Sequence, residues 1–146
     1  MIRLRKFELV DAIPLQEALY PNMPVSKVRE MIAPWNEGAF DGRWFKMMAV
    51  MLDESVAGYV SLYQQEADSV SFGIEIAPCY RCRGIATVAG GLAISIAAEE
   101  GYRKVVSQVR QDNAASVALH KKLGFVQTEA TVNRKGNPVF HYEIEI

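Results

Sequence analysis

The segment RCRGIA at residues 81–86 lies between a strand-like run that ends at Ile76 and a helical pattern that follows it. A helix N-terminus carries unpaired N–H groups and a partial positive charge, which together bind phosphate. Gly84 removes a side chain where the backbone must approach a ligand, and Arg81 and Arg83 add charge suited to a pyrophosphate. We therefore predict a phosphate-binding turn at the head of a helix.

Other interpretations of this turn are a tight connection with solvated arginines, a Walker A loop and a dinucleotide-binding loop. A Walker A loop ends in Gly-Lys-Ser/Thr, whereas this chain has Gly-Ile-Ala-Thr at residues 84–87. A dinucleotide-binding loop needs Gly-x-Gly-x-x-Gly in a largely parallel sheet, and that glycine pattern is absent. Only the plain tight turn remains open beside the phosphate site.

The chain before this turn predicts an antiparallel meander, and the chain after it predicts a βαβ unit. Three strand-like runs are joined by only a few residues, which permits hairpins and excludes parallel crossovers. Apolar residues at helical spacing then lead to Gly101 and another strand. The expected strands are 2–7, 44–52, 56–64, 69–76, 104–109, 126–132 and 139–146, and the expected helices are 11–19, 26–32, 86–100 and 113–122.

Particular residues mark the expected helix ends. Asp11, Ser26 and Asn113 are predicted N-caps, and Gly124 is predicted to end the last helix in the left-handed conformation. Residues 34–43 are expected to form a loop. The adjacent Gly90 and Gly91 are costly inside a helix, so we expect close packing on the sheet there.

Bulk properties place the chain among ordinary globular proteins. Its 146 residues suit one domain, 1–146, and its net charge of −1 gives no reason to expect nucleic acid as a partner. No apolar run approaches the roughly 20 residues that span a bilayer, and the N-terminus lacks the apolar stretch of a signal peptide. We expect a cytoplasmic protein that does not bind membranes. Two cysteines are too few for a disulfide framework.

Two motifs resemble signatures of the GNAT family of N-acetyltransferases. Arg81-x-x-Gly84-x-Ala86 matches the family's Arg/Gln-x-x-Gly-x-Gly/Ala, and residues 76–80 resemble the lead-in to it. The run from Asn113 to Phe125 resembles the second signature, Asn-x-x-(Ala/Ser)-x-x-Leu-(Tyr/His)-x-x-x-Gly-Phe. The resemblance is close over 70–125 and looser elsewhere.

This resemblance implies both the fold and the activity. The implied fold is α+β, layered α/β/α, with an antiparallel meander, a βαβ unit and a C-terminal strand pair, and with the sheet splayed at the coenzyme site. The implied reaction transfers an acetyl group from acetyl-CoA, without a metal, to a primary amine of a small molecule or peptide by direct attack in a ternary complex. A non-catalytic acyl-CoA-binding module of the same fold is the alternative.

The resemblance also implies roles for individual residues in coenzyme binding. The amides of 82–87 would bind the pyrophosphate, the backbone of 74–76 would pair with the pantetheine arm, and Asn113 would hydrogen-bond the coenzyme besides capping its helix. The implied coenzyme residues are Ile74, Ile76, Arg81, Cys82, Arg83, Gly84, Ile85, Ala86, Thr87 and Asn113.

Two residues are candidates for proton transfer. Glu75 would be the general base, and the alternative is a solvated strand carboxylate. His120 would be the general acid, since it stands where many family members have tyrosine; alternatively it packs near the thioester sulfur. A histidine of ordinary pKa is a weaker donor at neutral pH than this role requires. Tyr80 and Tyr142 are the fallback acids.

The acceptor side is expected to comprise residues 20–44 and 131–142. There Trp35, Phe40 and Trp44 could form an aromatic wall. Three acidic residues in the same region, Glu30, Glu37 and Asp41, could attract an amine, although such residues are more often core or solvated surface. The substrate and oligomeric state stay open, with a homodimer as one option. Cys79 and Cys82 have the spacing of half a zinc site or a redox pair, but no second Cys/His pair accompanies them.

Overall fold

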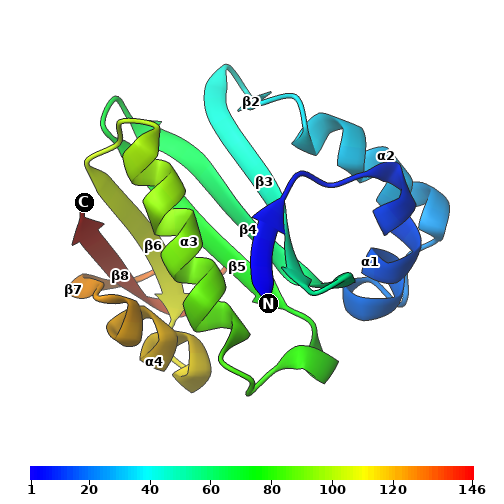
Figure 1. Cartoon of the computed structure of the whole chain (residues 1–146). Coiled ribbons are helices and arrows are strands. Elements are labelled where there is room, and N and C mark those ends of the chain that lie inside the picture. The colour runs from blue at the N-terminus through cyan, green and yellow to red at the C-terminus, as the bar shows by residue number, and fades with distance from the viewer.

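A mixed sheet of eight strands runs through the computed structural model, which describes residues 1–146 (Figure 1). The strand order is β1-β3-β4-β5-β6-β8-β7, and the short β2 pairs with β3 outside this path. Only β5 and β6 are parallel, so the predicted meander, βαβ unit and C-terminal strand pair are confirmed. The strands are β1 Ile2–Arg5, β2 Ala39–Phe40, β3 Arg43–Leu52, β4 Ser55–Glu66, β5 Ser69–Ile76, β6 Lys104–Arg110, β7 Val126–Val132 and β8 Pro138–Glu145.

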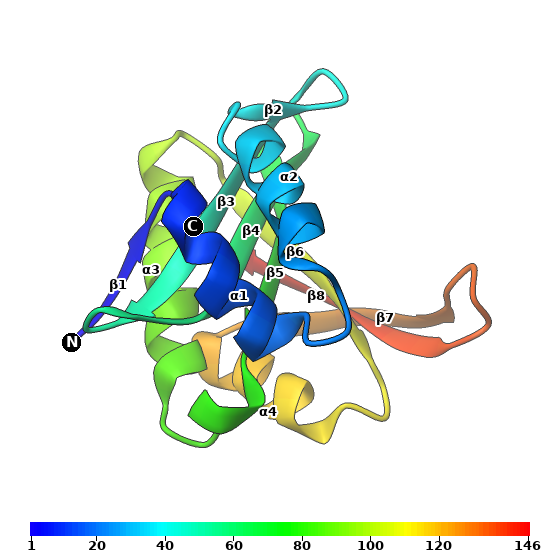
Figure 2. The ribbon, with the colours of Figure 1, turned by 90° about the vertical axis from the view of Figure 1, so that its right-hand side faces the viewer.

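Helices cover both faces of the sheet, which gives the expected α/β/α layers (Figures 1 and 2). α3 crosses one face with α4 beside it, while α1 and α2 lie on the opposite face over β3 and β4. The helices are α1 Ala12–Leu19, α2 Val25–Trp35, α3 Ile85–Glu99 and α4 Ala114–Leu123, with short 3₁₀ turns at Leu9–Asp11 and Pro78–Tyr80. None is long and apolar enough to cross a membrane.

Two hydrophobic clusters hold these layers together. The larger has 16 buried residues between the sheet and α3, where Ala89, Ala93 and Ala97 form a small-residue face that lets the helix lie close. The smaller has 8 buried residues, among them Leu15 of α1 and Ile32 of α2. Apolar burial on both faces therefore fixes the sheet on which the cleft is built.

The parallel pair β5 and β6 separates soon after it begins. The two strands pair only at Ser69, Val70 and Ser71 of β5, whereas β6 pairs with β8 from Lys104 to Arg110. The end of β5 is therefore paired on one side only, with β4. This is the splay that the resemblance implied.

Several expected helix boundaries are wrong. α2 begins at Val25 after Pro24, not after a Ser26 cap, and it continues through Pro34 to Trp35. Pro34 has no N–H to bond to the carbonyl of residue 30, and the helix ends one residue later, where the amides of Asn36 and the next residue bond back to the carbonyls of residues 33 and 34. The expected loop 34–43 also contains β2.

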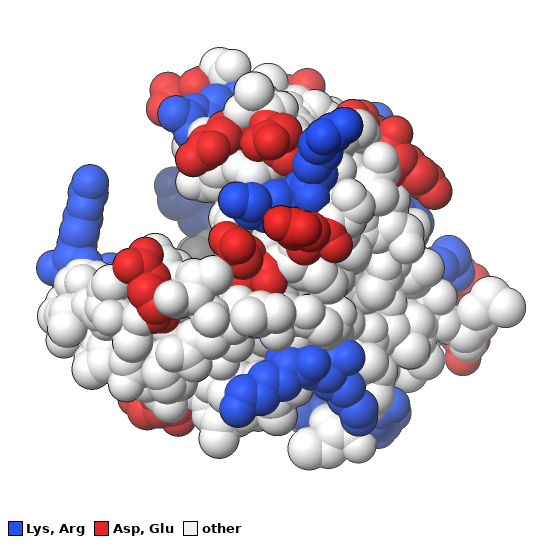
Figure 3. Space-filling view, turned by 90° about the vertical axis from the view of Figure 1, so that its left-hand side faces the viewer, with Lys and Arg blue, Asp and Glu red and all other residues white.

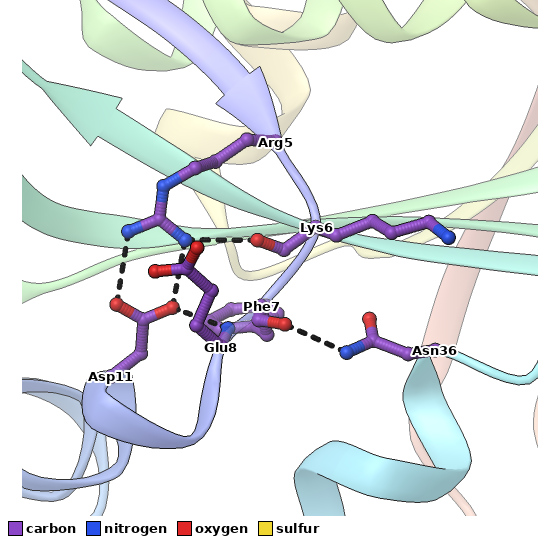
Figure 4. A network of polar contacts seen from close by, with 6 residues as sticks. All are labelled: Arg5, Lys6, Phe7, Glu8, Asp11 and Asn36. Atoms are coloured by element: carbon purple, nitrogen blue, oxygen red, sulfur yellow. Dashed lines mark hydrogen bonds and ion pairs between the residues drawn. The ribbon is translucent and has the colours of Figure 1, made fainter.

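Asp11 precedes α1 as expected, but its carboxylate does not cap that helix. It accepts two hydrogen bonds from Arg5, at 2.8 and 2.9 Å, and one from the amide of Glu8 at 2.7 Å (Figure 4). Burial acts to raise the pKa of Asp11, but these bonds outweigh it and hold the pKa below its ordinary value. Beside them, Asn36 donates to the carbonyl of Phe7 at 2.7 Å, which ties the end of α2 to the segment after β1.

The two glycines inside α3 differ. A Cβ at Gly90 would press on the side chain of Leu123 in α4, so the close contact is with a helix and not with the sheet as expected. A Cβ at Gly91 would meet nothing within 4 Å, and the structure offers no reason for glycine there.

Candidate functional site

A cleft of about 610 Å³ lies where β5, the turn at 81–84, the start of α3 and α4 meet. Every residue predicted to bind the coenzyme lines it except Arg83, and the predicted base Glu75 lines it too. Its full lining is Ile74, Glu75, Ile76, Tyr80, Arg81, Cys82, Gly84, Ile85, Ala86, Thr87, Asn113, Ala115, Ser116, Ala118, Leu119 and Lys122.

The turn before α3 and the first turn of that helix carry an unbroken row of free amides, and all the residues concerned except Arg83 line the cleft. The amide of Arg81 bonds to the Pro78 carbonyl and that of Val88 to the Gly84 carbonyl, but the six amides between them donate to no protein group. Gly84, the N-cap residue of α3, makes this possible by adopting φ +74°, and a Cβ there would project into open space. Six adjacent amides at a helix N-terminus form a site for a phosphate or pyrophosphate.

The last residues of β5 present free backbone groups to the same cleft. The amide of Ala77 bonds to the Ala57 carbonyl of β4, so odd-numbered residues of β5 direct their backbone bonds toward β4. Even-numbered residues face the gap, as the Phe72 carbonyl shows by lying 3.2 Å from Ser107 Oγ of β6. The amides of Ile74 and Ile76 therefore point into the cleft, where an extended chain with amide groups can pair with them.

Arg81 braces the end of β5. Its Nε donates to the Ile76 carbonyl at 3.0 Å and its guanidinium forms an ion pair with Glu75 at 3.0 Å. Arg83 lies over the ring of Tyr80, with its Cζ 5.6 Å from the ring centroid. The two arginines of the turn thus make intramolecular contacts, and backbone amides, not guanidinium groups, dominate the anion site.

Helix α4 forms the opposite wall. Asn113 caps it as predicted, because its side chain accepts from the amide of Ser116 at 3.0 Å. The remaining wall residues were not singled out from sequence, although they recur at helical spacing: Ala115, Ser116, Ala118, Leu119 and Lys122. Lys122 adds positive charge, and Figure 3 shows basic side chains gathered along the lower edge of the side on which α4 lies.

His120 lies behind this wall and not in the cleft. Its ring is only 3% exposed, and its nitrogens lie 2.8 Å from the Ser116 carbonyl oxygen and 2.8 Å from Ser107 Oγ. Burial lowers the pKa of His120, against a smaller raising effect of the Ser116 carbonyl. Tyr142 stacks on the ring and is equally buried, and its hydroxyl has no partner. Of the predicted acids, only Tyr80 lines the cleft.

Glu75 faces the side of the sheet that carries α1 and α2. It lies directly opposite Tyr59 of β4, and Trp35 lies 6.4 Å from the Tyr59 ring. Burial is the main cause that raises the pKa of Tyr59 to about 12, and the neighbouring Tyr20 and Glu75 contribute to the same rise. One carboxylate, two phenols and an indole therefore share the region where a second substrate could reach the cleft.

The expected aromatic wall does not form, since its three members belong to separate groups. Trp35 packs on Phe7, Phe40 is 62% exposed beside Phe45 and Tyr63, and Trp44 packs on Tyr102. The acidic residues of the same region are exposed, and Glu30 lies 3.6 Å from Lys27. Strand pairing places residue 44 at the far end of β3 from this region, which sequence proximity could not reveal.

Both cysteines are free and exposed. Cys82 lines the cleft in a left-handed conformation, φ +64°, while Cys79 lines a second cleft of about 550 Å³ beside α1. No three His, Cys, Asp or Glu side chains come together in a way that could hold a metal ion.

Comparison with known proteins identifies relatives of the whole architecture. A family model described as an acetyltransferase (GNAT) domain matches residues 2–126. The ribosomal protein bS18 alanine N-acetyltransferase of Salmonella typhimurium is 27% identical over 108 residues, 72% of each chain. RimL, a ribosomal alpha-N-protein acetyltransferase solved in complex with coenzyme A, has a TM-score of 0.89 at 17% identity, covering 99% of this chain and 94% of that one. A chimera of the Vibrio cholerae spermidine N-acetyltransferase SpeG has a TM-score of 0.79 at 20% identity, covering 98% and 95%. At such identities these two structures establish a shared fold.

Proposed function

The chain belongs to the GNAT family of acetyltransferases, and on that premise we propose that it transfers an acetyl group from acetyl-CoA to a primary amine of a small molecule or peptide by direct attack in a ternary complex. The observation that carries the proposal is the row of six unpaired amides from Cys82 to Thr87. No group of the protein uses them, and unpaired amides at a helix N-terminus favour an anion such as a pyrophosphate.

Donor binding would divide between the two edges of the cleft. The six amides would hold the pyrophosphate, and the free amides of Ile74 and Ile76 would pair with the amide-bearing pantetheine arm. Asn113 and Lys122 lie on the opposite wall, within the same cleft. In this arrangement the thioester would lie beside the end of β5.

The chain's own groups can supply the proton transfers. An alkyl amine has a pKa of about 10.4, so it needs a base to attack as the neutral form. Glu75 is our candidate base, because it lies next to the last residue of β5 and is only partly exposed. The amide of Ile76 would stabilise the oxyanion. Tyr80 is the candidate donor to the thiolate, since it alone among the predicted acids lines the cleft.

The relatives differ in what their names say they acetylate. One is named for an alanine of ribosomal protein bS18 and another for spermidine. We therefore propose only a primary amine, reached from the side that carries Glu75, Tyr59 and Tyr20.

Acetyl-CoA consumption against peptides, polyamines, amino acids and other amines tests the proposal. We expect acetyl-CoA to bind and at least one amine to be turned over. Binding without turnover on any amine would support the non-catalytic acyl-CoA-binding alternative instead. Absence of acetyl-CoA binding in calorimetry would overturn both.

A further inference from the structure

A chain of buried polar groups closes the inner end of the cleft. Pairing between β5 and β6 ends at Ser71. At the next residue, the carbonyl of Phe72 lies 3.2 Å from Ser107 Oγ of β6, which in turn lies 2.8 Å from Nε2 of His120. Nδ1 of the same ring lies 2.8 Å from the carbonyl of Ser116 in α4. Ser107 of β6 thus lies within hydrogen-bond distance of groups on β5 and on α4, the two walls of the cleft.

Counting protons along these contacts shows which nitrogen of the His120 ring carries a proton. The Ser116 carbonyl can only accept, so Nδ1 must carry a proton. A neutral ring then has a bare Nε2, which accepts the hydroxyl proton of Ser107 and leaves the Phe72 carbonyl without that donor. Only a cationic ring would let both bonds of Ser107 form at once.

The surroundings of the ring favour the neutral form. Phe72, Phe125 and Tyr142 contact it with centroid distances of 5.9, 5.0 and 5.4 Å, and of these only Tyr142 can titrate. Burial among these rings disfavours a charge. The shorter of the two Ser107 contacts is also the one to His120. A neutral ring with its proton on Nδ1 has none to deliver from Nε2.

We propose that Ser107 and His120 are positioning residues, which brace β6 and α4 at the point where β5 separates and so set the width of the cleft at Ile74 and Ile76. This role rests on the proposed function, because the spacing of the two walls matters only if the coenzyme arm lies between them. His120 then takes no part in proton transfer, in contrast to the role that its place in the family signature implied.

Nitrogen NMR of the histidines tests the brace without any coenzyme. The chain has two histidines, so a His141→Gln variant assigns the His120 signals. At pH 7 we expect a neutral ring protonated on Nδ1. A ring protonated on Nε2 alone would overturn the proposal, because the Nδ1 contact with the Ser116 carbonyl would then have no proton. An imidazolium would also overturn it, because the proposal requires a neutral ring that has no proton to deliver from Nε2.

Coenzyme A binding measured by calorimetry tests the consequence. Ser107→Ala should weaken binding about tenfold, since it leaves Nε2 of His120 without its donor and removes the hydrogen bond between β6 and α4. Ser107→Thr keeps the hydroxyl and should retain most of the affinity. Ser95→Ala, the same change on the exposed face of α3, is the matched control and should bind like the wild type.

The outcomes separate the brace from the proposed function. Wild-type affinity in Ser107→Ala, with a lowered kcat and an altered pH profile, would assign His120 to proton transfer and overturn the brace. If the wild type does not bind coenzyme A while the histidine spectrum is as expected, the proposed function fails and the structural brace stands. If Ser107→Ala does not fold, the NMR result alone decides.

Discussion

The two ends of the gap between β5 and β6 are built from different groups. At the open end, the proposed coenzyme site consists of backbone groups: the amides of 82–87 and those of Ile74 and Ile76. At the closed end, the side chains of Ser107 and His120 join β6 to α4. A backbone site tolerates changes of side chain as long as the local conformation survives, whereas the closed end depends on the identity of each residue. Substitutions at the two ends should therefore fail in different ways.

The largest effect is expected at the open end, from Gly84→Glu. The new carboxylate would lie among the six amides and repel a phosphate, and a side chain is strained at φ +74°. We expect coenzyme A affinity to fall at least about a hundredfold in calorimetry. Gly136→Glu is the control, because Gly136 also has a positive φ, +82°, and open space, but lies in the β7–β8 turn. Equal affinities in the two variants would contradict the assignment.

Glu75→Gln separates chemistry from binding at the same end. Loss of a general base should lower kcat about a hundredfold while coenzyme A affinity stays unchanged. Steady-state kinetics with the best amine measures this, and Glu99→Gln at the exposed end of α3 provides the control. A kcat close to the wild-type value would show that Glu75 is not the general base and that its role is limited to the ion pair with Arg81.

Gly58→Ala tests the strand pairing that supports the open end. A Cβ at Gly58 would overlap the carbonyl of Glu75, which is backbone and cannot move aside cheaply. We expect the free energy of unfolding in urea to fall by about 2–3 kcal/mol. Gly91→Ala, inside α3 with nothing within 4 Å, should instead raise it by up to about 1 kcal/mol. An unaffected Gly58→Ala would show that β4 is not held against β5 in this way.

Asn113 tests whether one side chain serves both structure and coenzyme. Asn113→Ala removes the cap of α4 and should cost about 1 kcal/mol of stability. Asn113→Asp keeps an acceptor for the Ser116 amide, so stability should be retained while coenzyme A binding weakens through added negative charge. Parallel urea unfolding and calorimetry measure the two effects, and a loss of both in Asn113→Asp would show that they cannot be separated.

The smallest expected effect is a pH dependence from the closed end. Because the pKa of His120 is lowered in the folded protein, the unfolded chain binds more protons as pH falls below about 6.5. The stability that the neutral ring contributes is therefore present above that pH and is lost on acidification toward the folded pKa. Urea unfolding between pH 7.5 and 5.5 should show this loss in the wild type and in His141→Gln. A wild type whose stability is flat over this range would contradict the neutral, buried ring.

The same contrast explains what could be predicted from sequence. The turn at 81–86 depends on local signals, a glycine at the start of a helix and a strand before it, and the structure has this turn where the sequence predicts it. Asn113 and Gly124 were found for the same reason, since a helix end is a local property.

Side-chain placement across the sheet could not be predicted in this way. His120 matches a signature position, yet its burial depends on Ser107, Phe125 and Tyr142, which other elements supply. Trp44 is near Trp35 in sequence but lies elsewhere, because the register of β3 carries it to Tyr102. Gly58 and Lys122 belong to no local sequence pattern. Gly58 is needed because β5 lies close to it, and Lys122 is part of the site because α4 forms one wall of the cleft.

The central claim is that the six free amides before and within the first turn of α3 bind the coenzyme. Amide NMR during titration with coenzyme A tests it most directly. We predict that the amide signals of 82–87, with those of Ile74 and Ile76, show the largest shifts, and that Gly84→Glu abolishes them. Saturable binding with its largest shifts elsewhere, for example in the cleft beside α1, would contradict the account.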